Sequence, residues 1–289
     1  MRQGRLGIGF ALAATVALIA LGCGGDDDTT STGASGASGV AGATGEGGPV
    51  GAGEVDVSFE TPQGGDNALG AKLFKAGDPG NLANILSDTF ELPDDLAVHG
   101  VNGFGPGPYY NPKDRSITYP YLFSTLVFQT LNQLHPEWSQ YRLGEGVGAV
   151  NSMVFEHEFA HALIDAYDLP VLGREEDAAD DLAVLLLIPA KGGNQFVSDS
   201  ASFWAALSNR QRVPQLSDYA DVHSFDLQRA FTMLCLLAGS SPENFQEVHA
   251  MGVVPDSRLA SCRAEFKQKA QSYEDVLEPH VQGDLDFGA

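Results

Sequence analysis

Basic residues and cysteines are scarce in this sequence. The 289 residues include 16 lysines and arginines against 38 aspartates and glutamates, which gives a formal net charge of -22. An acidic chain repels polyanions, so we expect no nucleic acid partner and no attraction to an anionic membrane surface. There are 3 cysteines. Neither Cys235 nor Cys262 has another Cys or His at ligand spacing, which argues against a cysteine-bound metal.

Long hydrophobic runs are also rare, and the clearest one lies at the N-terminus. Arg2 and Arg5 precede an apolar run over residues 6–21, which is somewhat short for a bilayer span. Basic, apolar and small residues in this order are typical of a signal peptide. Residues 20–23, Ala-Leu-Gly-Cys, resemble the lipobox of bacterial lipoprotein signal peptides, with alanine where leucine is more common. The resemblance implies cleavage after residue 22 and a diacylglycerol on the sulfur of Cys23.

Residues 1–22 are therefore predicted to be a lipoprotein signal peptide, with a plain secretory signal or an uncleaved anchor as the alternative. Each possibility predicts export, and the lipoprotein predicts a bacterial cell-envelope location, lipid-anchored outside the cytoplasm. Residues 23–53 hold Cys23 and a stretch of Gly, Ala, Ser, Thr and Asp that contains much of the glycine excess. Such a stretch has almost nothing to bury, so it is predicted to be a flexible tether. Residues 54–289 are predicted to form the folded domain.

The folded part is predicted to be α+β, with a small N-terminal sheet and a mostly helical C-terminal half. Alternating apolar residues predict a strand that begins near residue 55, and two further short strands follow it. The expected strands cover residues 55–59, 96–101 and 116–119, with a Gly/Pro-rich loop at 103–112. The expected helices cover residues 82–90, 121–134, 150–167, 175–188, 202–207, 226–238 and 257–273.

The clearest chemical signal is an HExxH motif in an amphipathic helix. His157 and His161 are four residues apart, so both imidazoles project from one face and can reach one metal ion. Glu158 is then placed beside the open coordination position. A metal would also explain why these polar groups fall on an otherwise apolar helix, where unpaired burial is costly.

Zinc needs a third protein ligand if a position for water is to stay open. Glu176 and Asp180 are four residues apart at the start of the next predicted helix, so they share a face. This ExxxD spacing after HExxH resembles the thermolysin-like gluzincin arrangement. The resemblance implies that Glu176 binds zinc and that Asp180 orients a metal-bound histidine from behind. Glu175 and Asp177 are the alternative ligands, and acids at a helix N-terminus also favour the helix dipole.

The wider sequence resembles a family of bacterial putative metallopeptidases that are mostly exported. The resemblance spans roughly residues 90–280 and is carried by residues 157–180, by Asp221 to Arg229 and by residues 258–265. It implies a zincin-like fold around an active-site helix. Residues 103–123 depart most from the family pattern, which concerns the N-terminal wall of the cleft.

The predicted function is zinc-dependent hydrolysis of peptide bonds in a peptide or protein substrate, with one Zn²⁺ as cofactor. Glu158 would act as general base on a metal-activated water. His223, next to Asp221, is the candidate for stabilising the oxyanion, and Tyr219 could do the same. Residues 116–119 are the candidate strand for holding an extended substrate.

Two further expectations concern the C-terminal half. Once Cys23 is set aside, Cys235 and Cys262 form an even pair in an oxidising compartment, which predicts a disulfide between them. Arg229 is expected to pair with acids of the packed helices or to bind a substrate carboxylate.

The alternative function is a non-catalytic envelope lipoprotein that retains a metal-binding zincin fold and acts by binding a partner.

Overall fold

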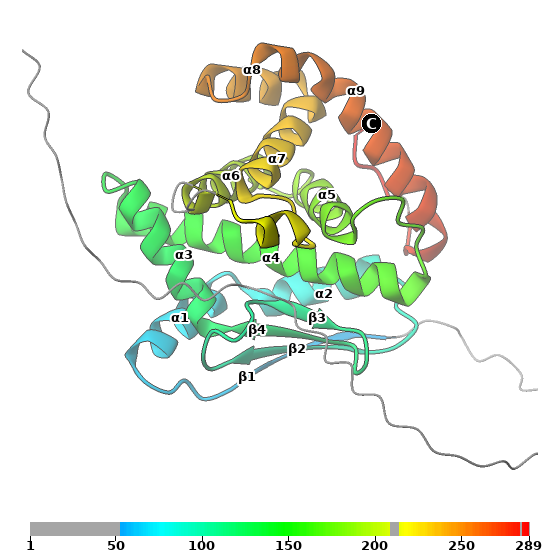
Figure 1. Ribbon diagram of the computed structural model, residues 1–289. Helices are drawn as coiled ribbons and strands as arrows, with labels where there is room; N and C mark the ends of the chain where they lie inside the picture. Colours follow the sequence, from blue (N-terminus) through cyan, green and yellow to red (C-terminus); the bar gives the residue numbers. More distant parts are fainter. Residues whose placement is uncertain (1–52, 209–213, 284, 289) are drawn as a thin grey trace, which may run out of the picture.

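The computed structural model describes residues 53–208, 214–283 and 285–288 (Figure 1). The predicted signal peptide, Cys23 and nearly all of the predicted tether lie outside the described residues. Within the described ranges, none of the helices combines the length and the apolar character that a membrane span requires. The expectations of lipidation and anchoring therefore remain predictions from the sequence.

The described part contains a four-stranded mixed sheet with the strand order β1-β2-β4-β3. β1, β2 and β4 are parallel, and β3 is antiparallel to β4. The strands are β1 (Val55–Phe59), β2 (Leu96–Val101), β3 (Tyr109–Asn111) and β4 (Ser116–Pro120). The prediction of an uninterrupted loop over residues 103–112 was wrong, because Tyr110 pairs with Ile117 and so extends the sheet by one short strand.

The candidate substrate strand also needs correction. β4 lies inside the sheet, where β2 and β3 occupy its two hydrogen-bonding edges. A strand whose backbone groups are already paired on both sides cannot accept an added peptide strand. The antiparallel β3, predicted as loop, is instead at an edge of the sheet.

Helix α4 (Gln140–Tyr167), which contains the HExxH motif, is longer than the sequence predicts. The prediction started it at residue 150, because glycines precede that point. The helix in fact begins after Ser139, whose hydroxyl caps its first turn. At Gly146 a Cβ atom would lie 2.8 Å from the Trp138 ring, so this glycine allows close packing inside the helix. The low helix propensity of glycine is overridden there by tertiary contact.

The remaining helices are arranged around α4. Short helices α1 and α8 were not predicted, and α6 begins nine residues earlier than expected, with the polar residues Ser198, Asp199 and Ser200 buried inside it. The ranges are α1 (Gly65–Ala76), α2 (Pro79–Thr89), α3 (Tyr121–Leu134), α5 (Glu175–Leu187), α6 (Gly193–Ser208), η1 (Leu216–Ala220), α7 (Asp226–Ser240), α8 (Pro242–Met251), α9 (Asp256–Leu277) and η2 (Glu278–His280).

α4 lies between the sheet and the C-terminal helices, with α5, α6 and α7 on its far side and with α8 and α9 packed against α7 (Figure 1). Apolar residues of α4 are buried on both sides of the helix. Phe159, for example, packs against Phe90, with ring centroids 5.6 Å apart. The α+β prediction is thus confirmed. The central position of α4 holds any functional group on it in a rigid, largely buried setting.

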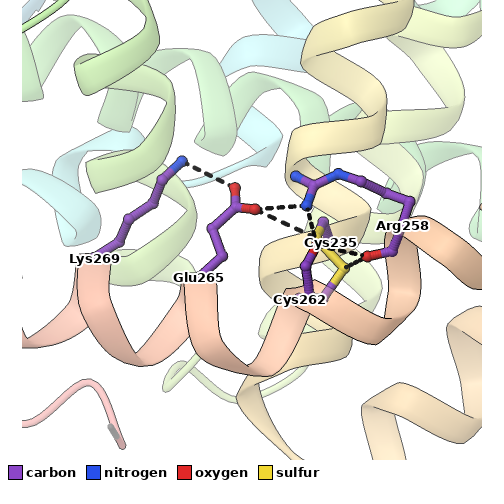
Figure 2. Close-up of a disulfide and its surroundings, with 6 residues drawn as sticks. Cys235, Arg258, Cys262, Glu265 and Lys269 are labelled. Atoms are coloured by element: carbon purple, nitrogen blue, oxygen red, sulfur yellow. Dashed lines mark hydrogen bonds and ion pairs between the residues drawn. A yellow bond between two sulfur atoms is a disulfide. The ribbon is translucent and has the colours of Figure 1, made fainter.

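The predicted disulfide is confirmed between Cys235 of α7 and Cys262 of α9 (Figure 2). Both cysteines are fully buried. The two helices approach closely there, because a Cβ atom at Gly239 would lie 2.3 Å from the carbonyl oxygen of Cys262. Beside the bond, Arg258 pairs with Glu265 at 2.6 Å. The crosslink therefore fastens α9 to α7.

Candidate metal centre

Three potential ligand atoms from α4 and α5 meet in a triangle. His157 and His161 project from successive turns of α4, and their Nε2 atoms are 3.3 Å apart. The Oε2 atom of Glu176, in the first turn of α5, lies 3.2 Å from the His157 nitrogen and 3.3 Å from the His161 nitrogen. The α4–α5 turn thus brings the predicted third ligand to the pair of histidines.

The size of this triangle fits a tetrahedral metal ion. Ligand atoms around such an ion lie about 3.3 Å apart when the metal–ligand bonds are about 2.0–2.1 Å long. The three observed separations agree with this value. Two imidazole nitrogens and one carboxylate oxygen are a donor set that zinc accepts, and three protein ligands leave a fourth position open.

The far side of each imidazole contacts a carboxylate. Nδ1 of His157 lies 2.8 Å from Oδ1 of Asp180, and Nδ1 of His161 lies 2.8 Å from Oε1 of Glu175. A carboxylate accepts a hydrogen bond from Nδ1–H, so this arrangement favours the tautomer that leaves the lone pair of Nε2 directed at the triangle. Asp180 has the position that the sequence predicts for it.

Glu175 does not have the position of a third metal ligand, which the sequence left open for it. It was an alternative ligand, but its contact is with His161 Nδ1, on the side away from Glu176. Adjacent residues on a helix point about 100° apart, so only one of two neighbouring glutamates can enter the triangle. His161 and Glu175 are 14 residues apart, so the sequence pattern does not predict this contact. The contact depends on how the turn between α4 and α5 folds.

The charges of the site favour a cation at its centre. Burial disfavours the ionised form of Glu176, but contacts with His157, His161 and His223 outweigh burial and hold its pKa well below the usual range. Burial also lowers the pKa of His157, yet Asp180 and Glu176 outweigh it and raise that pKa to about 10. The carboxylates that stabilise a proton here would also attract a metal cation.

Glu158 is buried next to this triangle. Burial lowers the pKa values of His157 and His161, and the Glu158 carboxylate acts in the opposite direction on both. Its charge therefore acts on both imidazoles. This position is compatible with the sequence prediction that Glu158 lies beside the open coordination position.

His223 is brought to the triangle from a distant part of the chain. Its Nε2 atom lies 2.9 Å from Oε2 of Glu176, and its Nδ1 atom lies 3.2 Å from Oδ1 of Asp221. Arg174 donates to the carbonyl oxygen of His223 at 3.1 Å. The imidazole is 37% exposed, so it faces both solvent and the site.

Tyr219, the other candidate for the same role, has a ring contact with Phe225. It belongs to η1 and is 61% exposed, and the contact is edge-on at a centroid distance of 5.4 Å. Arg229 pairs with Asp180, as the first of its two expected roles requires. A direct role for Arg229 in binding a substrate carboxylate is contradicted by its burial and by this pairing.

The fold and the site together define an α+β protein whose central helix contributes two histidines to a His-His-Glu group able to hold a metal ion. The chain belongs to the family described as "Putative metallopeptidase", which matches residues 65–277. Neither a curated protein nor a solved structure matches the chain. The family supports a peptidase that uses a metal and acts on peptide or protein substrates.

Proposed function

We propose that this protein is a zinc-dependent, zincin-like peptidase of the gluzincin type. The observation that carries the proposal is the triangle of His157 Nε2, His161 Nε2 and Glu176 Oε2, with each imidazole supported by a carboxylate at Nδ1. If the acids of α5 served only to favour the helix dipole, there would be no need for two histidines whose Nε2 lone pairs point at the same place. The donor set and the separations of about 3.3 Å favour zinc among the common metals.

Zinc bound by these residues would supply a Lewis acid and lower the pKa of a bound water. The residues of the chain then divide the remaining work. Glu158 accepts a proton from the attacking water and delivers it to the leaving amine, because a carboxylate can act first as base and then as acid. This carboxylate is buried, and its charge acts on both imidazoles.

His223 stabilises the negative charge that develops on the substrate carbonyl oxygen. Its imidazole is close to Glu176, and a hydrogen bond to Asp221 orients the ring. A donor at this position acts where charge develops, as in other hydrolases of acyl groups. The contact of Arg174 with the carbonyl oxygen of His223 helps to hold the segment near the site.

An extended peptide substrate pairs with β3. This strand is at an edge of the sheet, so its outer backbone groups can add a strand. The hydroxyl of Tyr110 donates to Asp165 of α4 at 2.8 Å, which ties β3 to the helix that carries the histidines. A peptide on this edge therefore runs beside α4.

The protein acts outside the cytoplasm, anchored to a membrane of the bacterial cell envelope through lipid on Cys23. The support comes from the order of residues 1–23 and from the disulfide, because disulfides persist in oxidising compartments. Radiolabelled fatty acid should be incorporated into wild-type protein and not into Cys23→Ala; equal labelling of the two would contradict this part of the proposal.

The test of the enzymatic proposal combines metal analysis with peptide cleavage. Purified wild-type protein should contain about one zinc per chain and cleave a peptide library in a chelator-sensitive way. Glu158→Ala should keep the zinc and lose the cleavage. Zinc without cleavage in both proteins would favour the alternative function, a non-catalytic envelope lipoprotein that binds a partner. Absence of metal would contradict both.

A further inference from the structure

We propose that Arg229 is a positioning residue of the metal centre, acting through Asp180 on His157. The inference rests on the proposed function, because it concerns the same site. Arg229 lies on α7, Asp180 on α5 and His157 on α4, so the chain of contacts joins three helices. It leads from the guanidinium group to one corner of the ligand triangle.

The contacts fix the Asp180 carboxylate completely. Nε of Arg229 donates to Oδ2 at 2.7 Å, and Nη2 donates to Oδ1 at 2.7 Å. The same Oδ1 atom lies 2.8 Å from Nδ1 of His157. Two parallel hydrogen bonds from a planar fork define the plane of the carboxylate, which a single contact cannot do. The orientation of Asp180 in turn sets the direction of the His157 ring.

The guanidinium group is itself held in place. Its central carbon lies 3.8 Å from the centroid of the Trp204 ring, on α6. Arg229 and Asp180 are 8% and 4% exposed, so water has little access to either. Burial disfavours the ionised form of Asp180, but Arg229 and His157 outweigh it and hold the pKa of this carboxyl well below its usual range. The carboxylate thus stays charged and oriented.

Among the described residues, the carboxylate that contacts the second histidine is less protected. Glu175, which contacts His161, has a side chain that is 54% exposed. Solvent can therefore compete for this carboxylate and screen it. Rigid positioning of the site is concentrated at His157, and Arg229 is the residue on which that positioning depends.

The chain offers a matched control at a second Arg–Asp–Trp unit. Arg142 donates to both oxygens of Asp199, at 2.7 and 2.6 Å, and its guanidinium lies 4.0 Å from the centroid of the Trp138 ring. This unit joins the first turn of α4 to α6 and contacts none of the three ligand residues. Substitution of Arg142 removes the same kinds of contact without touching Asp180.

The experiment compares Arg229→Lys and Arg229→Met with Arg142→Lys and Arg142→Met. Zinc affinity is measured by competition with a chromophoric chelator, and the ligand geometry is measured from the absorption spectrum of the cobalt-substituted protein. Both Arg229 variants should bind zinc about 10-fold or more weakly and shift the cobalt spectrum. Both Arg142 variants should match the wild type.

Arg229→Lys keeps the positive charge and loses the bidentate fork, so it decides the matter even if Arg229→Met fails to fold. Wild-type zinc affinity and an unchanged cobalt spectrum in Arg229→Lys would overturn this inference and leave the proposed function standing. A wild-type protein that binds no metal would overturn the proposed function and this inference together. Equal weakening in the Arg142 variants would also overturn the inference, because it would show a general effect of lost packing.

Discussion

Glu175, Glu176 and Asp180 lie close together on α5 and differ mainly in what each one contacts. Glu176 meets both Nε2 atoms, while Glu175 and Asp180 each meet one Nδ1 atom. Glu175 and Glu176 lie in the first turn of α5, where the helix dipole favours acids in any case. Their separate roles therefore come from direction, and chemical type alone would not distinguish Glu175 from Glu176.

At the residue scale, His223 and Tyr219 can be separated by experiment. His223→Ala should lower kcat about 100-fold or more, because a donor to the developing oxyanion is lost. Zinc content should stay at the wild-type level. Tyr219→Phe serves as the control and should retain wild-type kcat, since His223 contacts Glu176 while the Tyr219 ring packs against Phe225. Steady-state kinetics on one peptide checks both. A larger loss in Tyr219→Phe than in His223→Ala would reverse the assignment.

At the scale of elements, α7 and α9 are joined by one covalent bond. The disulfide closes a loop with a sequence separation of 27. Loss of a crosslink of this span should lower the free energy of unfolding by about 3.5 kcal/mol, since the unfolded chain gains freedom. We expect this change in the double variant Cys235→Ala, Cys262→Ala, measured by urea unfolding. Zinc binding should persist, because the three ligand residues belong to α4 and α5; unchanged stability would contradict the expectation.

The contact between α5 and α9 predicts a pH dependence. Lys269 donates to the Asp181 carboxylate at 2.7 Å, but burial outweighs this pairing and raises the pKa of Asp181 from 3.8 to about 6. The folded state therefore binds this proton more tightly than the unfolded state. The contribution to stability is fully present below about pH 4 and is lost as the pH rises through about 6.

Asp181→Asn should remove this dependence. Relative to the wild type, the free energy of unfolding of the variant should rise by up to about 3 kcal/mol between pH 4 and pH 7. Urea unfolding at several pH values measures this difference. All other titrating groups are the same in the two proteins, so their contributions cancel. Parallel pH profiles of the two proteins would show that Lys269 compensates for burial fully.

The elements show how far local patterns reach. The three predicted strands and most of the helices are present, since alternation and 3.6-residue periodicity report the buried face of each element. The first part of α4 was missed at Gly146, where close packing against Trp138 requires a residue that disfavours helix. β3 was missed as well, because only its pairing with β4 makes residues 109–111 a strand.

At the scale of the whole molecule, the site joins elements that contact one another only in the folded state. The histidines come from α4, the carboxylates from α5, Arg229 from α7, and His223 from the segment before α7. A ligand that binds this assembled site binds the native state and not the unfolded chain. Metal binding should therefore stabilise the entire fold.

Chelation should accordingly lower Tm. When the free metal concentration is about 100 times the dissociation constant, binding stabilises the native state by about 2.7 kcal/mol. A chelator should remove this stabilisation. His161→Ala is the control, because it lacks one ligand and its Tm should no longer respond to chelator. Differential scanning calorimetry with and without chelator measures both. An equal response of the two proteins would place the stabilising metal elsewhere.

The sequence by itself determined the chemistry that depends on short spacing. The i, i+4 placement of His157 and His161 follows from helix geometry alone, and the pairing of Cys235 with Cys262 follows once Cys23 is set aside as the predicted lipidation site. Only the tertiary structure decided which glutamate meets both histidines, which strand is at the edge of the sheet, and that Arg229 contacts Asp180. Those outcomes depend on how separate helices and strands approach one another, and long-range packing leaves little trace in local periodicity.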